Sequence, residues 1–129
     1  MTSVAVDSWA FIEVALGGER AAHVARALAA AGSPFTTREV VVEAFGFIHR
    51  ASDANLAWRW WHALRAGRVR VIDIPYESLA EHLEAVARKG GLSLADHSLA
   101  LAALAEGATD VLTADRGFRR LGLNPLLAA

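Results

Sequence analysis

The chain has 129 residues, of which 54% are hydrophobic, contains no cysteine and carries a formal net charge of −1 at pH 7. This length and composition favour a single domain over residues 1–129 with a substantial core, and the absence of cysteine excludes disulfides, thiolate metal sites and cysteine nucleophiles. No apolar run reaches the length of a membrane span and no signal peptide is recognisable before Trp9, so we expect a cytoplasmic protein.

Short apolar segments alternate with segments of helical periodicity along the chain. In chain order they predict a strand at 4–6, a helix that breaks at Gly17-Gly18, a helix at 19–31, a strand at 34–37, a helix at 38–50, a helix from Ser52 or Asp53 to Gly67, a strand at 69–74, helices at 76–89 and 94–106, a strand at 110–113, a short helix within 115–121 and a strand at 123–127. Pro125 confines the last strand to a sheet edge. This alternation is typical of an α/β fold with a central parallel sheet of four to five short strands flanked by helices.

Four carboxylates fall where such a fold places its ligands, beyond the carboxyl ends of the strands. Asp7 follows the first strand directly, Asp115 follows the strand at 110–113, Glu43 lies one turn into the helix after the second strand, and Asp96 lies in the first turn of a helix. Carboxylates crowd together only for a compensating reason, and oxygen-only ligands favour Mg²⁺ or Mn²⁺. One or two such ions can activate a water for phosphodiester displacement. Without metal, at least one of these acids is expected to have a raised pKa.

Each of these acids also has a purely structural interpretation. Asp7 could cap the helix that begins near Trp9, Asp96 could close a capping box with Ser93, and Asp115 could form an Asx turn. Glu43 belongs to a polar stripe at helical spacing, which is most often a solvated helix face. Its other members are Glu39, Gly46 and Arg50. Position alone leaves both interpretations open.

Four segments of the chain resemble the PIN-domain family, and within it the VapC-type toxins of prokaryotic toxin–antitoxin pairs. They are residues 4–9 (VAVDSW), 36–43 (TTREVVVE), 92–96 (LSLAD) and 112–118 (LTADRGF), with residues 107–109 (GAT) matching as well. The third and fourth segments are the most specific. The four segments together span nearly the whole chain, which is therefore similar to a single PIN-like nuclease domain.

The resemblance implies a PIN-like three-layer fold, Mg²⁺- or Mn²⁺-dependent cleavage of RNA, a homodimer and inhibition by a cognate antitoxin. The lack of a long apolar run adds the expectation of no membrane contact. It implies further that the catalytic and metal-binding residues are Asp7, Glu43, Asp96 and Asp115, supported by Ser8 and Thr113. Trp9 stands where the family usually has a small polar residue, and Gly117 stands where a further acid is common. Glu39 is the alternative ligand if the second segment is displaced by one turn.

The helix that ends at Gly67 contains three tryptophans. Trp60 and Trp61 share its apolar arc, which predicts core or interface packing, whereas Trp58 falls outside the arc. For Trp58 we expect an interface contact first and stacking on an RNA base second, ahead of simple packing on its own domain. Arg65 and Arg116 are further candidates for RNA or interface contacts. His97 adjoins Asp96 but points about 100° away on the same helix, so we expect it to be non-catalytic.

Other functions remain open from the sequence. A housekeeping PIN nuclease in RNA processing would use the same acids, and an inactive PIN module would bind RNA or a partner without chemistry. A phosphoacceptor signalling domain is disfavoured, because it needs paired acids after the first strand and a lysine after a late strand. Here Asp7 stands alone and the only lysine is Lys89, at a helix end.

Overall fold

A five-stranded, wholly parallel sheet forms the centre of the molecule. We describe a computed structural model, which covers residues 3–86 and 91–129. The strands are β1 (Ser3–Val6), β2 (Ser33–Thr37), β3 (Arg70–Ile72), β4 (Asp110–Leu112) and β5 (Asn124–Pro125). Their order is β3-β2-β1-β4-β5, and every neighbouring pair is parallel. This confirms the predicted α/β fold and the higher of the two predicted strand numbers.

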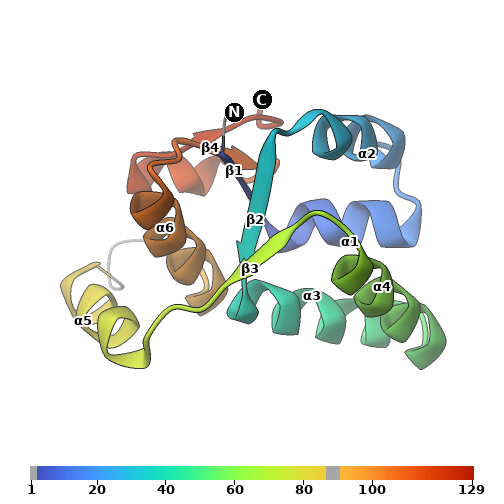
Figure 1. The fold of residues 1–129 in the computed structure, drawn as a ribbon, viewed down its shortest axis with the longest axis horizontal. Coiled ribbons are helices and arrows are strands. Elements are labelled where there is room, and N and C mark those ends of the chain that lie inside the picture. Colours follow the sequence, from blue (N-terminus) through green and yellow to red (C-terminus); the bar gives the residue numbers. More distant parts are fainter. Residues whose placement is uncertain (1–2, 87–90) are drawn as a thin grey trace.

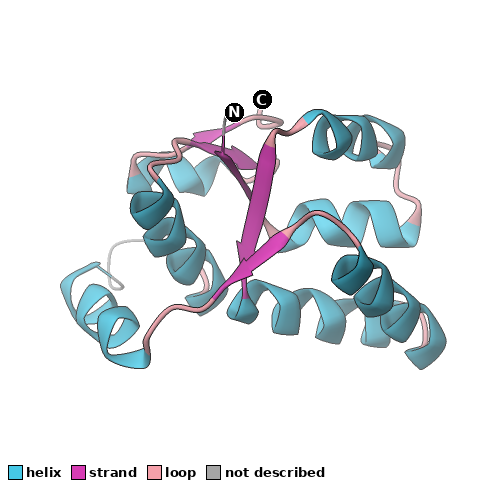
Figure 2. Cartoon of the chain, in the orientation of Figure 1, coloured by secondary structure: helices cyan, strands magenta, loops and turns pink. Residues whose placement is uncertain are grey.

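Helices cover both faces of this sheet (Figures 1 and 2). In Figure 1, α1, α2 and α4 lie to the right of the sheet and α5 and α6 to its left, while α3 extends from the lower end of β2. The helices are α1 (Ser8–Leu16), α2 (Ala21–Ala30), α3 (Arg38–Ala51), α4 (Ala54–Ala66), α5 (Tyr76–Val86), α6 (Leu94–Glu106) and the 3₁₀ helix η2 (Arg116–Leu121). None of the described helices is long and apolar enough to cross a membrane.

Most predicted helix boundaries lie within one or two residues of the observed ones. The predicted caps are confirmed at Asp53, whose side chain accepts from the backbone of Leu56, and at Ser93. Gly17 and Gly107 end α1 and α6 with left-handed backbone at φ of 65° and 67°, a conformation that glycine adopts without steric cost. The predicted end of α5 near Lys89 lies outside the described residues.

Three predicted elements are shorter in the structure. The helix predicted from residue 19 begins at Ala21, because Gly18–Arg20 form a turn in which the carbonyl of Gly18 accepts from Ala21. The strand predicted at 69–74 is confined to β3, and the one at 123–127 to β5. β5 lies at the sheet edge, as Pro125 requires because its nitrogen cannot donate to a ladder.

The core lies between the sheet and its helices. The side chains of Phe35, Phe118, Ile48, Leu99 and Leu112 are all almost completely buried. The strand order reverses at β1, because β2 and β3 are added to the sheet on one side of it and β4 and β5 on the other. In parallel α/β sheets, ligands bind beyond the carboxyl ends of the strands at such a switch point. The residue that follows β1 therefore lies where the fold favours a site.

Candidate metal site at the carboxyl edge

Three of the four predicted acids meet at the carboxyl end of β1. One carboxylate oxygen from each of Asp7, Glu43 and Asp96 lies within 4.8 Å of the other two. Asp7 follows β1, Glu43 lies on α3 and Asp96 lies in the first turn of α6. Residues 89 positions apart in the sequence thus form one cluster, because β1 and β2 are neighbours and α6 packs across both.

Asp7 is held by hydrogen bonds at both carboxylate oxygens. Its Oδ1 accepts from the backbone nitrogen of Ser8 at 2.7 Å, which makes Asp7 the N-cap of α1. Its Oδ2 accepts from Oγ1 of Thr113 at 2.7 Å, across two neighbouring strands. Only 3% of the residue is exposed. The carboxylate is therefore fixed in position before any ligand binds.

Hydroxyl groups also position Glu43 and the helix that carries it. Oγ of Ser8 donates to Oε1 of Glu43 at 2.5 Å. The buried hydroxyls of Thr37, the N-cap of α3, and Ser98 on α6 are hydrogen-bonded at 2.7 Å. This contact joins the start of α3 to α6 and so fixes the relative position of Glu43 and Asp96.

Asp96 takes part in a complete capping box. Its Oδ2 accepts from the backbone nitrogen of Ser93 at 2.9 Å, and its own backbone nitrogen donates to Oγ of Ser93 at 3.1 Å. The structural interpretation of Asp96 is thus confirmed, and yet the same carboxylate belongs to the cluster. A carboxylate has about four acceptor positions, so one hydrogen bond leaves room for a cation.

Two acids of the cluster have raised pKa values, as expected, although burial contributes more to the shift than the crowding of charges does. Burial raises the pKa of Asp7 to about 7, and the charges of Asp96 and Glu43 act in the same direction, against the hydrogen bonds from Thr113 and Ser8. Burial likewise raises the pKa of Asp96, and the charges of Glu43 and Asp115 add to the effect. The ionised cluster is therefore unfavourable until a positive charge compensates it.

Asp115 lies at the rim of the site and outside the group of three. Its Oδ1 accepts from the backbone nitrogen of Gly117 at 2.7 Å, which confirms the predicted Asx turn. Its backbone nitrogen donates to Oγ1 of Thr113, the hydroxyl that binds Asp7. Its charge also acts on the pKa of Asp96. Asp115 is thus coupled to the cluster, while its carboxylate points into the turn.

The donor set suits a hard divalent cation. Three carboxylates offer oxygen ligands without nitrogen or sulfur, a set that favours Mg²⁺ or Mn²⁺ over softer metals. Buried acids with raised pKa values gain from a nearby cation, which favours their ionised form. Glu39, the alternative to Glu43, lies outside the cluster and forms a 3.9 Å ion pair with Arg38.

Trp9 and Gly117, the two residues expected to depart from the family pattern, each fit their surroundings in the structure. Trp9 packs against the core, and the guanidinium of Arg20 lies 5.4 Å from its ring centroid. At Gly117, a Cβ would lie 3.0 Å from both Oδ1 of Asp115 and Cδ2 of Leu92. A side chain at position 117 would therefore push against the Asx turn that shapes the rim of the site.

His97 and two of the surface candidates make contacts outside the group of three carboxylates. His97 is buried, and its Nδ1 lies 2.9 Å from Nε2 of His82 on α5. Trp58 is exposed and packs edge-on against Phe45 of α3, with ring centroids 4.9 Å apart. Arg65 stacks over the ring of Trp61.

A polar hollow of about 580 Å³ adjoins Asp115. Arg116 and Arg120 line it together with Gly91 and Leu92, so it combines two cations with the rim of the acid cluster. Arg116, predicted as a candidate RNA or interface contact, lines this hollow next to Asp115.

A second open groove reaches the cluster from the other side. It has a volume of about 630 Å³ and lies between α3 and the start of α6. Its lining includes Glu43, Gly46, Arg50 and Leu94. From the sequence, Gly46 and Arg50 were expected to lie on a solvated helix face. The only feature of the sequence that could have indicated this groove is a glycine in a helix interior, three residues after the candidate ligand Glu43.

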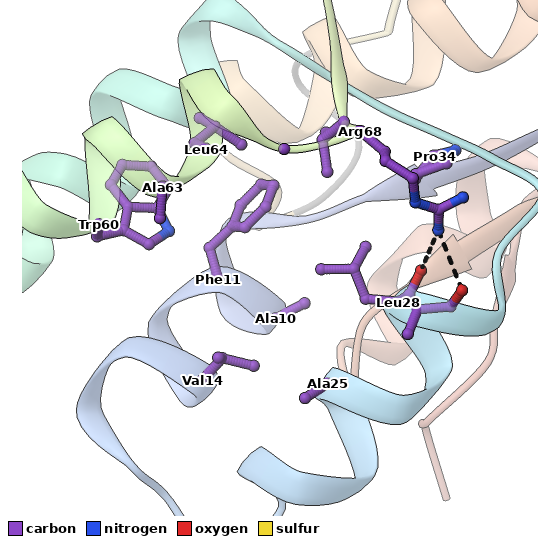
Figure 3. A pocket seen from close by; sticks show the side chains of 13 residues that line it. Ala10, Phe11, Val14, Ala25, Leu28, Pro34, Trp60, Ala63, Leu64 and Arg68 are labelled. Carbon is purple, nitrogen blue, oxygen red and sulfur yellow. Dashed lines mark hydrogen bonds between the residues drawn. The ribbon is translucent and has the colours of Figure 1, made fainter.

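An apolar pocket of about 410 Å³ lies elsewhere, between α1, α2 and α4 (Figure 3). Phe11 and Trp60 meet edge-on within it, with centroids 5.5 Å apart. Arg68 lies at its border and donates to the carbonyls of Leu28, Ala29 and Ala31 at the end of α2. The pocket has no carboxylate among its lining residues, so it offers no set of acidic ligands for a cation.

Comparison with known proteins agrees with this geometry. The model of the PIN domain family matches residues 4–123. No curated protein matches the sequence. The fold is similar to that of VapC20 from Mycobacterium tuberculosis, a toxin that cleaves the sarcin–ricin loop, with a TM-score of 0.84 and 19% identity over 95% of this chain and 98% of that one. It is also similar to a chain of VapBC2 from Rickettsia felis, solved bound to a DNA fragment from its promoter, with a TM-score of 0.67 and 16% identity over 95% and 96% of the two chains.

Proposed function

Because the chain belongs to the PIN domain family, we propose that it is a metal-dependent endoribonuclease that acts in the cytoplasm as the toxin of a type II toxin–antitoxin pair. The observation that carries the nuclease assignment is the convergence of Asp7, Glu43 and Asp96 at the carboxyl end of the central strand. The toxin assignment is supported by the likeness of the fold to VapC20 and VapBC2. On the same basis, we propose that this chain acts on RNA and is bound by a cognate antitoxin.

The residues proposed to hold the metal are Asp7, Glu43 and Asp96, with Asp115 at the rim. A Mg²⁺ or Mn²⁺ ion supplies a Lewis acid that activates water and offsets the charge of a phosphodiester undergoing displacement. The chain offers no cysteine, and the reaction needs no covalent nucleophile on the protein.

The protein's own contribution is to keep the acid ligands fixed. Thr113 and the backbone of Ser8 hold Asp7 by its two oxygens, and the hydroxyl of Ser8 holds Glu43. Such hydrogen-bonded supports orient metal ligands and are often needed for full activity. We therefore propose Ser8 and Thr113 as positioning residues and the four acids as the catalytic set.

The activity test uses the purified chain, free of any partner, with single-stranded or looped RNA. Cleavage is expected with Mg²⁺ or Mn²⁺ and is expected to stop on addition of EDTA. Asp96→Asn should reduce the rate by orders of magnitude, because a metal ligand serves every catalytic role of the ion. Asp53→Asn is the matched control, since Asp53 is also an N-cap and Asn caps about as well as Asp. Full activity of Asp96→Asn would exclude the proposed site.

A second readout, thermal melting, tests metal binding without RNA. Mn²⁺ at a hundredfold excess over its dissociation constant should stabilise the wild type by about 2.7 kcal/mol, and Asp96→Asn should gain less. Without metal, Asp96→Asn should melt at a higher temperature than the wild type, because it removes a charge from a buried acidic cluster. A lower melting temperature, with an unchanged Mn²⁺ response, would leave Asp96 as a helix cap only.

Growth arrest on expression distinguishes a toxin from a housekeeping nuclease. The wild-type chain should stop growth of a bacterial host, and Asp96→Asn should not. An active nuclease that leaves growth unaffected would support the housekeeping alternative.

A further inference from the structure

The groove between α3 and α6 has one wall built from residues spaced four apart. Arg38, Val42, Gly46 and Arg50 follow one another along α3, and residues at this spacing lie on one face of a helix. The opposite wall is the start of α6, with Leu94 and Ala95. Glu43 lines the groove and belongs to the acid cluster as well. The groove is therefore continuous with the proposed metal site.

Gly46 makes room in this groove for the guanidinium of Arg50. A Cβ at position 46 would lie 3.2 Å from Nη1 of Arg50, so the guanidinium lies over the bare backbone of Gly46. Gly46 is three residues, about one helical turn, beyond Glu43. This places a positive charge about one turn from an acid of the cluster.

The charge of Arg50 is available for a ligand. Within the described part of the chain, Arg50 has no carboxylate within ion-pair distance, whereas Arg38 at the other end of the wall lies 3.4 Å from Asp73 and 3.9 Å from Glu39. A planar guanidinium with free donors is the side chain best suited to bind a phosphate by two hydrogen bonds.

Two exposed aliphatic side chains face the same groove from its opposite walls. Val42 is 67% exposed and Leu94 is 53% exposed. Exposed apolar groups beside an unpaired cation suit a ligand with a flat apolar face and a negative charge, as a nucleotide has. A strand with one phosphate at the acid cluster must also continue past Glu43, and this groove offers it a path.

We propose that this groove binds the RNA nucleotide next to the scissile phosphate, with Arg50 on its phosphate and Val42 and Leu94 against its base. The inference rests on the proposed nuclease function and names the part of the substrate that the groove takes. Arg50 is a binding residue in this scheme and takes no part in the hydrolysis itself.

Fluorescence anisotropy with a labelled single-stranded RNA of about ten nucleotides tests the inference directly. EDTA is present, so that the RNA stays intact. Arg50→Ala should weaken binding on the order of tenfold, since hydrogen bonds to charged groups have about this effect. The slope of log K against log salt should fall by about 0.7, the value for one phosphate contact on a single strand. Arg50→Lys should keep the slope.

Two further variants make the test specific. Arg26→Ala removes an arginine on α2 that is also exposed but lies outside the groove, and it should change neither affinity nor slope. Leu94→Ala should weaken binding a few-fold and leave the salt slope unchanged, because it removes apolar contact and no charge. With Mg²⁺ or Mn²⁺, Arg50→Ala should raise KM at nearly constant kcat.

Failure of the inference is separable from failure of the proposed function. The groove assignment would be overturned if the wild type cleaves RNA but Arg50→Ala binds RNA as tightly as Arg26→Ala and with the same salt slope. The groove would then be a candidate site for a protein partner. If the wild type cleaves no RNA, the proposed function fails, and the anisotropy measurements still decide whether the groove binds RNA.

Discussion

At the scale of single residues, the structural and the catalytic interpretations of an acid do not exclude each other. Asp7 caps α1, Asp96 closes a capping box and Asp115 forms an Asx turn, and still Asp7 and Asp96 meet Glu43 within 4.8 Å. A helix start that faces the carboxyl edge needs an acceptor there, and the same carboxylate has further lone pairs that point outward. Sequence spacing alone could therefore never decide between a cap and a ligand.

The raised pKa of Asp7 predicts how the stability of the metal-free protein depends on pH. Its folded value of about 7 lies above the unfolded value of 3.8, so the folded state binds more protons between these limits. The free energy of unfolding should fall as pH rises from about 4 to about 7 and level off above. The shift corresponds to a loss on the order of 4 kcal/mol. Denaturant unfolding in EDTA at pH 4 to 8 measures this loss.

The variant Asp7→Asn is the control for this prediction. It has no titrating group at position 7. Its amide oxygen can still accept from the backbone of Ser8, and its NH2 group can donate to the hydroxyl of Thr113. Its stability should vary less between pH 5 and 7 than that of the wild type. Identical pH profiles for the two proteins would contradict the assignment of the raised pKa to Asp7.

At the scale of helices and strands, the sequence was most informative where a single residue type enforces a conformation. Gly17, Gly107 and the caps Asp53 and Ser93 all act where predicted. The weakly determined elements were short ones such as β3 and β5, whose lengths depend on which backbone groups find partners in a neighbouring strand. Periodicity within one segment carries no information about that neighbour.

Helix α3 contains a glycine that we expect to lower its stability. Gly46 lies in the helix interior, and the nearest atom to an added Cβ is the mobile tip of Arg50. Gly46→Ala should therefore raise the free energy of unfolding by roughly 0.5–1 kcal/mol, because alanine loses less backbone entropy in a helix. Denaturant unfolding at constant pH and metal concentration measures the gain.

The double variant Gly46→Ala/Arg50→Ala separates the two contributions. It has the helix-favouring alanine without the guanidinium, so adding Gly46→Ala to Arg50→Ala should give the full gain. If Gly46→Ala instead lowers stability in both backgrounds, the space above Gly46 is more closely packed than the contacts indicate.

At the scale of the whole molecule, the acids meet because of the strand order, which no local pattern contains. The sequence placed Asp7, Glu43 and Asp96 at the correct edge by the general rule for parallel sheets. That β1 lies between β2 and β4 follows from pairings between distant segments. The groove lined by Arg50 and Leu94 was missed for the same reason, since its two walls are more than 40 positions apart.

We expect the chain to form a homodimer whose contact includes α4, the helix that carries Trp58. This side chain is 51% exposed and packs edge-on against Phe45 and Trp61, and exposed tryptophans are frequent hot spots of interfaces. Trp58→Ala should weaken dimerisation by about 2 kcal/mol or more, as measured by sedimentation at several concentrations. Leu104→Ala, on the exposed face of α6, is the control and should leave the dimer intact. A wild-type monomer at micromolar concentration would contradict the prediction.

The hydrogen bond between Thr113 and Asp7 joins residues 106 positions apart. Contacts of such long range close late, because the entropy of bringing distant segments together must be overcome first. The first strand has its full set of neighbours only after the segment from Asp110 to Leu112 has been made and has inserted beside it. A chain that still lacks this segment cannot hold Asp7 by both carboxylate oxygens, so the proposed metal site is complete only once β4 lies beside β1.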